Sequence, residues 1–434
     1  MDTIKTFSGF LLTSALLLQP AGGLDAQTQE AAGDVERAQL TLGDLRTFTD
    51  VFNQARRNYV EPVEDRTLLD AAIRGMLTDL DPHSSYLTPE EYSELKDSSK
   101  GRYSGIGVRM DVGDGRIVID AVIDDSPADR AGINPGDVIT AVEGEAVKGR
   151  LLPDAIGQMD GDPGTDLRLT VLTPDGEERE LLMTREYLLM PTLGFEWLDD
   201  GWGYFRMTQF HQESANHLRD ALDSIAAEGT VLEGLFIDLR NNPGGVLQPA
   251  VELADGFLEG GRIVSVKGRN TNMQMEFDAR PGDWLPGIPV VLLVDRGSAS
   301  ASEVLAGALQ DHGRALVVGE RTFGKGSVQS VLPLRNGGAI KLTTARYYTP
   351  NGRSIQARGI LPDVEVTFDD SDEPDARRRE ADLDHHLDLD GIEDGDATAV
   401  EPIGMEFPVE EILEVLDGAG MLESAEPEAG DESA

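Results

Sequence analysis

The spacing of hydrophobic residues changes along the chain, and these changes divide it into predicted domains. Apolar side chains first recur at helical spacing, at Leu45, Phe48, Val51, Phe52 and Ala55. A second amphipathic pattern covers 68–77, and Thr88 followed by Pro89 marks the start of a third helix. We therefore predict an N-terminal helical segment over residues 27–100.

Short strands replace the helices over residues 101–186. Apolar runs bounded by glycine or turn residues occupy 104–110, 116–122, 135–142 and 167–172. This pattern predicts a small β domain between the N-terminal helical segment and the remainder of the chain.

Strands alternate with helices over residues 187–367. Apolar runs of strand length stand at 232–239, 290–294 and 315–319, with helical patterns between them. Such alternation is typical of a layered α/β core. The predicted fold class is therefore a multidomain α+β or α/β protein.

The composition changes again beyond residue 367. The tail 368–434 is rich in acidic residues, and we expect it to be mostly disordered apart from one short helix over 408–416. The whole chain of 434 residues has a formal net charge of −43, which repels nucleic acid and anionic membranes. It has no cysteine, which excludes disulfides, thiolate metal sites and a cysteine nucleophile.

Residues 1–26 indicate a signal peptide. Lys5 precedes an apolar stretch over 7–18 that is too short to span a bilayer comfortably. We favour removal of this segment on export, and an uncleaved anchor is the alternative. The protein is thus predicted to be periplasmic or otherwise exported, and membrane-associated if the segment is retained.

Three serines and one lysine carry the candidate chemistry. Ser298, Ser300 and Ser302 follow the buried strand 290–294, so that a hydroxyl could stand exposed where the strand meets a helix. Lys325 lies between two glycines further along. A lysine accepts a proton at neutral pH only if burial lowers its pKa. The pattern indicates nucleophilic catalysis by a serine with an uncharged amine as the base.

Other polar candidates are weaker. His83 stands alone in the turn 81–87, and we interpret it as structural rather than as a catalytic base. The stretch 319–325 imitates a phosphate-binding loop, but Gly326 stands where a magnesium-binding Ser or Thr belongs. Residues 388–391 faintly resemble a calcium loop, but Ala397 replaces the necessary glutamate. We predict no metal, cofactor or nucleotide.

The segment 101–186 resembles a PDZ domain of the kind found in bacterial proteases. The matching motifs lie at 105–108, 126–132 and 136–139. The resemblance implies that a loop holds the terminal carboxylate of a peptide while the adjacent strand edge pairs with it. That loop consists of Gly105, Ile106, Gly107 and Val108. The implied partners are proteins or peptides with apolar C-termini.

Further motifs at 238–245, 297–303 and 319–326 resemble those of the carboxy-terminal processing, or tail-specific, proteases of peptidase family S41. Motifs at 347–356 and 359–363 also fit, so that the resemblance covers about residues 45–367. It implies a PDZ domain placed before a serine–lysine protease core.

The resemblance assigns individual roles. It implies that Ser300, the middle serine, is the nucleophile and that Lys325 is the base. It further implies that Gln329 orients the lysine, and it matches Asp311 to an acidic position near the site, for which we favour a structural role.

An oxyanion hole needs backbone N–H donors aimed at the developing charge. Ala301, just after Ser300, is the natural first donor. The turn at Gly244 and Gly245 offers the second, because glycine allows close backbone approach.

We therefore predict an exported serine endopeptidase that binds protein C-termini through its PDZ domain and cleaves the tagged protein. The alternatives are a catalytically silent PDZ scaffold or adaptor and an esterase of similar fold. A homo-oligomer or an adaptor protein partner is also left open.

Overall fold

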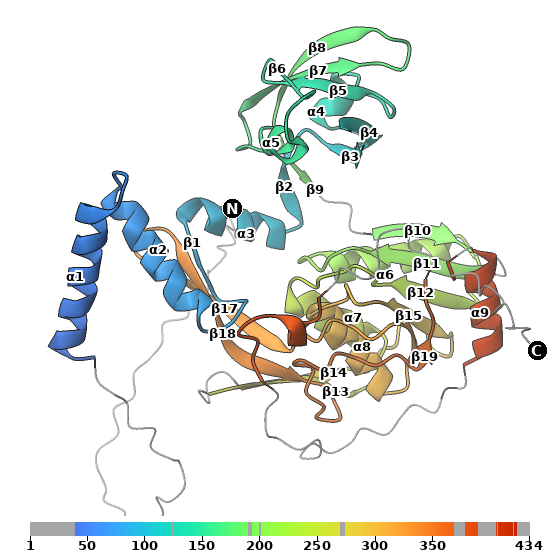
Figure 1. Cartoon of the computed structure of the whole chain (residues 1–434). Coiled ribbons are helices and arrows are strands. Elements are labelled where there is room, and N and C mark those ends of the chain that lie inside the picture. The colour runs from blue at the N-terminus through green and yellow to red at the C-terminus, as the bar shows by residue number, and fades with distance from the viewer. Residues whose placement is uncertain are drawn as a thin grey trace, which may run out of the picture. The chain divides into compact units, whose positions relative to one another are not determined.

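The chain divides into two compact units, Met1–Leu68 and Leu69–Ala434, in the computed structural model shown in Figure 1. The structure describes residues 40–113, 115–123, 125–189, 193–198, 201–269, 274–368, 378–388, 405, 407–419 and 421–422. The predicted signal peptide lies outside these residues. Of the helices that the structure describes, none is long and apolar enough to cross a membrane.

The first unit contains helix α1 (Leu42–Asn58), which a reciprocal cap begins. The Thr41 hydroxyl accepts the Asp44 N–H at 3.2 Å, and the Asp44 carboxylate accepts the Thr41 N–H at 2.8 Å. None of the α1 side chains is buried. Helix α2 (Asp65–Thr78) runs across the boundary between the units and confirms the helix predicted over 68–77.

The predicted third helix is α3 (Pro89–Ser99), and it begins at the expected cap, Thr88. The turn before it is held by Asp81, whose carboxylate accepts the N–H groups of His83 and Ser84, both at 2.9 Å. Strand β1 (Ser85–Leu87), which the sequence did not predict, then pairs with β18 of the second unit. This pairing fixes the turn against the sheet that contains β18.

The predicted β domain is a small antiparallel sheet in the order β3-β4-β5-β7-β8, with β6 on β5. Its elements are β3 (Val108–Gly113), β4 (Arg116–Val122), α4 (Pro127–Arg130), β5 (Val138–Val142), β6 (Glu145–Ala146), α5 (Leu152–Gly157), β7 (Asp166–Leu172) and β8 (Glu178–Thr184). Strands β2 (Arg102–Gly105) and β9 (Glu186–Leu189) pair where the chain enters and leaves the domain. Ile117, Ile139 and Leu167 lie in its hydrophobic core.

The predicted α/β core is confirmed as a sheet in the order β10-β11-β12-β15-β16-β19. The strands are β10 (Leu193–Trp197), β11 (Trp202–Met207), β12 (Gly234–Asp238), β15 (Val290–Val294), β16 (Ala315–Gly319) and β19 (Val364–Glu365). All neighbours are parallel except β10 and β11. Parallel strands of this kind are buried on both faces, which explains their continuous apolar runs.

Helices cover the two faces of this sheet, as Figure 1 shows. Ile237 and Leu292 face the core formed with α6 (Ser214–Ala227), α7 (Leu247–Gly256) and α8 (Ala301–Asp311). Phe236 and Leu293 point to the other face, where they pack with residues of α9 (Val409–Gly418). Successive strand residues face opposite sides, so each strand serves both cores.

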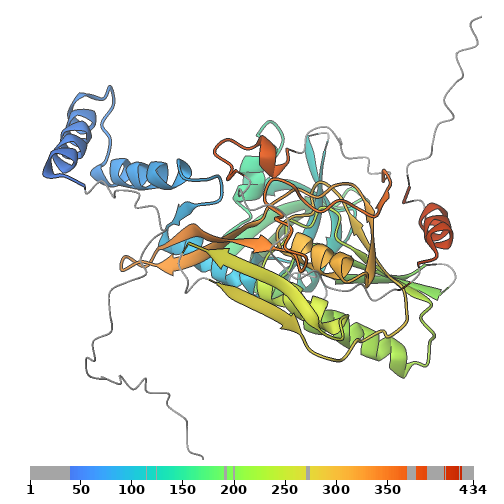
Figure 2. The same cartoon turned by 90° about the horizontal axis from the view of Figure 1, so that it is seen from below.

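A second antiparallel sheet contains β1, β13 (Gly261–Gly268), β14 (Met275–Ala279), β17 (Ser327–Pro333) and β18 (Ala339–Tyr348). Figure 2 shows β17 and β18 as a long hairpin, drawn in orange. The loop 320–326 runs from β16 of the α/β sheet to β17 of this one. Lys325 therefore lies where the chain passes between the two sheets.

Parts of the acidic tail are folded. Helix α9 confirms the short helix predicted over 408–416, and it buries Ile412, Val415 and Leu416. A separate segment, 378–388, includes the short 3-10 helix η4 (Glu380–Asp382). The remainder of the tail lies outside the described residues.

Candidate active site

Ser300 stands at the turn between β15 and α8. Its φ of 57° and ψ of −111° are values that L side chains rarely adopt. Strain of this kind is concentrated at functional sites, and a sharp strand-to-helix turn is a known way to expose a nucleophilic hydroxyl. The backbone thus supports the prediction of an exposed hydroxyl at this junction.

Burial separates the three candidate serines. Ser298 and Ser302 are 0% exposed, whereas Ser300 is half-buried. The Ser298 hydroxyl donates to the Leu239 carbonyl at 2.8 Å, and the Ser302 hydroxyl donates to the Asn242 carbonyl at 3.0 Å. Of the three, only Ser300 is accessible to a substrate.

The glycine turn lies directly against Ser300. A Cβ placed on Gly244, which has a φ of +93°, would lie 2.8 Å from the Ala301 nitrogen and 2.9 Å from the Ser300 Cβ. The Gly244 N–H donates to the Asn242 side-chain oxygen at 2.9 Å. Ala301 opens helix α8, so its N–H is among those without an intrahelical partner. The space that only a glycine leaves open is thus bordered by the Ala301 amide and the nucleophile candidate.

Lys325 is half-buried in the loop between β16 and β17. Burial lowers the pKa of Lys325 below its ordinary value, and the positive charge of Lys341 lowers it further. Glu380, Glu303 and Asp81 oppose this shift, because their negative charges favour the protonated amine. The balance is the one that a lysine base requires.

Glu303 links Ser300 to the lysine loop. Its Oε2 accepts the Ser300 N–H at 2.8 Å and the Lys325 N–H at 2.9 Å. Its Oε1 accepts the Thr322 hydroxyl at 2.6 Å and the Gly324 N–H at 2.7 Å. One carboxylate oxygen therefore fixes the backbone of both catalytic candidates.

Glu303 was not among the residues predicted for the site, although its spacing from Ser300 contains a signal. Ser300 and Glu303 have the Ser-x-x-Glu spacing of a helix cap, in which the glutamate reaches back to the cap residue's N–H. Burial raises the pKa of Glu303 to about 7, while hydrogen bonds from Thr322 and the three amides act in the opposite direction. The ionised form can accept from all these donors, since a carboxylate only accepts.

Gln329 lies on β17. Its side-chain amide donates to the Ser327 hydroxyl at 3.0 Å and to the Thr343 hydroxyl at 3.2 Å. These bonds use both amide hydrogens, so the carbonyl oxygen of Gln329 is the atom left to accept a hydrogen bond from the amine of a lysine. Within the described residues, no hydrogen bond joins Gln329, Lys325 and Ser300 side chains to one another. Catalytic hydrogen bonds often close only when substrate binds.

Asp311 stands at the far end of α8 from Ser300, roughly 16 Å away at 1.5 Å per residue. Its carboxylate forms an ion pair with Arg353 and accepts the Asn351 N–H at 2.8 Å. The structure therefore does not bring Asp311 to the other candidates, and its contacts fit the structural role that we favoured.

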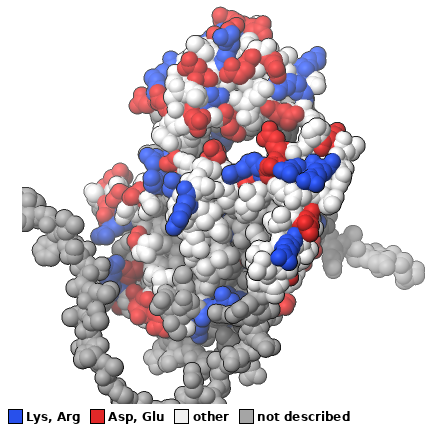
Figure 3. Space-filling model, turned by 90° about the vertical axis from the view of Figure 1, so that its left-hand side faces the viewer, with Lys and Arg blue, Asp and Glu red and all other residues white. Residues whose placement is uncertain are grey.

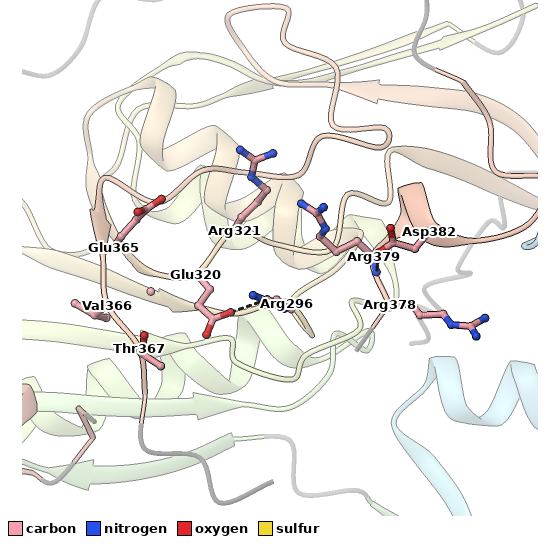
Figure 4. A pocket seen from close by; sticks show the side chains of 10 residues that line it. Arg296, Glu320, Arg321, Glu365, Val366, Thr367, Arg378, Arg379 and Asp382 are labelled. Carbon is pink, nitrogen blue, oxygen red and sulfur yellow. Dashed lines mark hydrogen bonds and ion pairs between the residues drawn. The ribbon is translucent and has the colours of Figure 1, made fainter. Parts of the chain in front are cut away.

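A cavity of about 760 Å³ lies at the carboxyl ends of β15 and β16. Figure 4 shows its lining, in which Arg296 and Glu320 form an ion pair at 2.9 Å. Arg321, Arg378 and Arg379 also line it, as do Glu365 and Asp382. Ser300 and Lys325 are not part of this lining, which includes Glu320 and Arg321 from the start of the lysine loop.

The predicted carboxylate loop of the PDZ domain precedes β3, which is an edge strand of its sheet. Ile106 is buried, and its carbonyl accepts the Ala128 N–H at 2.9 Å. A Cβ on Gly107 would lie 2.3 Å from the Ser126 Cβ, so this position requires glycine. The loop thus packs on α4 while β3, which begins at Val108, keeps one edge unpaired within the described sheet.

Charge on the surface is mixed in sign. Figure 3 shows Lys and Arg interspersed with Asp and Glu over the face that it displays. Among the described residues, no group of three or more His, Asp or Glu side chains could hold a metal ion.

Comparison with known proteins identifies three segments. The profile of peptidase family S41 matches residues 201–366, and that of the PDZ domain matches residues 118–173. The profile of the activating protease CtpB N-terminal domain matches residues 11–91.

Similar proteins cover most of the chain. A carboxy-terminal-processing protease of Bartonella bacilliformis is 41% identical over 332 residues, which is 76% of each chain. The carboxy-terminal processing protease CtpA of Bacillus subtilis is 33% identical over 375 residues, 85% of this chain and 78% of its own. Among solved structures, a photosystem II D1 C-terminal processing protease is 29% identical and covers 75% of this chain and 94% of its own, with a TM-score of 0.44.

Proposed function

Because the chain belongs to peptidase family S41, the carboxy-terminal processing serine proteases, we propose that Ser300 and Lys325 form its catalytic dyad. The observation that carries this proposal is that one oxygen of the Glu303 carboxylate accepts the backbone N–H groups of both residues. A group that fixes both backbones also fixes their relative position, and thereby limits where the hydroxyl and the amine can lie.

The proposed reaction is acyl transfer. The neutral amine of Lys325 takes the proton from the Ser300 hydroxyl as Oγ attacks a substrate carbonyl. The lysine then gives that proton to the departing amine, which leaves an acyl-enzyme, and water activated by the same lysine hydrolyses it. Gln329 orients the amine through its carbonyl oxygen.

The oxyanion formed during attack is held by backbone N–H groups. Ala301 supplies one, and the positive end of α8 favours the negative charge there. The Gly244 N–H is directed to Asn242, so Gly245 is the donor we assign from the glycine turn, while Gly244 provides the space.

Substrate selection is assigned to the PDZ domain. An extended C-terminus pairs with the open edge of β3, and the loop at Gly105, Ile106, Gly107 and Val108 receives its carboxylate. The apolar stretch over 7–18 supports export, so the proposed substrates are periplasmic or other exported proteins with apolar C-termini.

The test compares cleavage of a model protein that ends in an apolar tail with the same protein ending in two aspartates. We expect the wild type to cleave the first faster, and Ser300→Ala to bind it without cleaving it. Ser302→Ala, which removes a buried hydroxyl two residues away, is the control and keeps cleavage. Cleavage by Ser300→Ala at the wild-type rate would overturn the dyad. Binding without cleavage by the wild type would instead support a scaffold.

A further inference from the structure

Glu380 is a buried carboxylate that comes from the acidic tail. Its side chain is 1% exposed, and its Oε2 lies 2.7 Å from the His83 Nε2. Its Oε1 accepts the Gln356 side-chain N–H at 2.8 Å. A buried carboxylate is costly unless it is paired and hydrogen-bonded, and both oxygens here have partners.

The partners of Glu380 lead to the lysine loop from both sides of Lys325. The Glu380 N–H donates to the Phe323 carbonyl at 3.1 Å. Gln356, which Glu380 holds, accepts the Gly326 N–H on its side-chain oxygen at 3.1 Å. The residue two positions before the lysine and the residue directly after it are therefore both held through Glu380.

The same segment is anchored at other points. The Gln356 side chain also donates to the Leu387 carbonyl at 3.2 Å. Arg379 and Asp382 lie beside the lysine loop, because they line a cavity together with Glu320 and Arg321, as Figure 4 shows. On the opposite side, His83 belongs to the turn 81–84, in which Asp81 and Ser84 bind Thr343. Glu380 thus connects a turn near the N-terminus with the catalytic loop.

We propose that Glu380 is a positioning residue for Lys325, and that segment 378–388 of the acidic tail is therefore an obligatory part of the active site. The inference rests on the proposed function of Lys325 as the base. Segment 378–388 lies beyond the range 201–366 that matches the S41 profile, so the catalytic core depends on chain from outside it. A displaced base loses rate even when its chemistry is intact, and an error of ~1 Å can cost ~100-fold.

A purely structural role for Glu380 predicts something different. If Glu380 only stabilised the fold, its variants would lower the amount of folded enzyme but leave kcat and the pH profile of that folded enzyme unchanged. If it positions Lys325, kcat falls and the pH profile of kcat/KM shifts, because the charge that acts on the lysine has changed.

The direction of the shift follows from the charges around Lys325. Glu380, Glu303 and Asp81 raise its pKa, and Lys341 lowers it. Replacing Glu380 with glutamine removes one of these negative charges. The lysine pKa then falls further, so the rising limb of the profile moves to lower pH.

The experiment uses the full chain with Glu380→Gln, and Asp384→Asn as the matched control. Asp384 is an exposed acid on the same segment, so its substitution removes one charge without touching the lysine loop. For Glu380→Gln we expect kcat to fall roughly 10–100-fold, KM to stay within about 3-fold and the rising limb to move to lower pH. Asp384→Asn should match the wild type in all three.

A wild-type kcat and pH profile in folded Glu380→Gln would overturn the inference. If that variant is not recovered folded, His83→Gln decides, since it removes the other partner of the 2.7 Å contact with Glu380 and His83 is the less buried of the two. A reduced kcat with a shifted profile supports the inference, and unchanged values overturn it. Ser300→Ala separates the two levels: activity in Ser300→Ala refutes the dyad, whereas an inactive Ser300→Ala beside a normal Glu380→Gln refutes only the role of Glu380.

Discussion

Two buried carboxylates, Glu303 and Glu380, hold the loop that carries Lys325, and they differ in how they reach it. Glu303 lies in the first turn of α8 and binds the Ser300 and Lys325 amides directly. Glu380 lies in the acidic tail and acts through Gln356 and its own N–H. The contacts of Glu303 are local to the nucleophile, and we call them the near frame. The contacts of Glu380 depend on tertiary folding, and we call them the remote frame.

Both frames position Lys325. Removing the Lys325 amine should therefore lower kcat more than breaking either frame does. Lys325→Met keeps an unbranched apolar side chain, one heavy atom shorter, and removes the amine. We expect kcat to fall by roughly 10⁴-fold or more, since removal of one member of a catalytic unit has effects of that order. Steady-state cleavage of the apolar-tailed protein measures it. A loss smaller than that of Glu303→Gln would mean that Lys325 is not the base.

The glycine turn beside Ser300 shapes the proposed oxyanion site, and Gly244→Ala tests it. The new Cβ would lie 2.6 Å from the Ala299 carbonyl oxygen and 2.8 Å from the Ala301 nitrogen, at a φ of +93°. We expect kcat to fall roughly 10²–10³-fold, as for the loss of an oxyanion donor, with smaller change in KM. Gly149→Ala, a control at a similar φ of +90° with open space around it, should lose stability but not kcat. Equal activity of Gly244→Ala and wild type would contradict the assignment.

Glu303→Gln breaks the near frame itself. Glutamine offers one acceptor oxygen, so it cannot accept from all four donors, and we expect kcat to fall roughly 10²-fold. The pKa of about 7 lies above the ordinary value of 4.5, so native protein binds the extra proton between these pH values and loses stability as pH rises through them. Glu303→Gln removes this dependence, which amounts to at most about 3 kcal/mol.

The stability part of that prediction is checked by urea unfolding of both proteins at pH 5 and pH 8. The free energy of unfolding of Glu303→Gln minus that of the wild type should be larger at pH 8 than at pH 5, because only the wild type loses stability as pH rises. The opposite sign would show that the folded protein prefers the carboxylate and that its hydrogen bonds outweigh burial.

Asp311 lies outside both frames and should have the smallest catalytic effect. Asp311→Asn weakens the ion pair with Arg353 and the bond from Asn351 at the far end of α8. We expect about 1–3 kcal/mol lower stability and kcat within about 3-fold of wild type. A kcat loss as large as that of Glu303→Gln in fully folded protein would place Asp311 in the catalytic machinery.

The near frame could be predicted from sequence to a useful degree. The apolar run 290–294 and the helix after it locate Ser300, and β15 and α8 confirm both elements. The spacing of Ser300 and Glu303 contained the cap that joins them. These features depend on residues close together in the chain, where periodicity and capping rules apply.

The remote frame could not be predicted in this way. The acidic composition of 368–434 indicated a solvated tail, yet Glu380 is buried because His83 and Gln356 provide its partners from distant parts of the chain. Strands β1, β13 and β14 were missed for a similar reason, since they form by pairing with distant strands rather than by a strong local pattern. Tertiary contacts of this kind leave little trace in hydrophobic spacing.

The central claim, a Ser300 hydroxyl activated by the neutral amine of Lys325, is tested most directly by the pH dependence of covalent labelling. A fluorophosphonate reacts with the activated serine, and peptide mass spectrometry identifies the labelled residue. We predict that Ser300 alone is labelled. The labelling rate should rise with pH, and the midpoint of this rise should lie below the ordinary lysine pKa of 10.5. Lys325→Met should lose this rise. Labelling of Ser298 or Ser302, or an unchanged pH profile in Lys325→Met, would contradict the account.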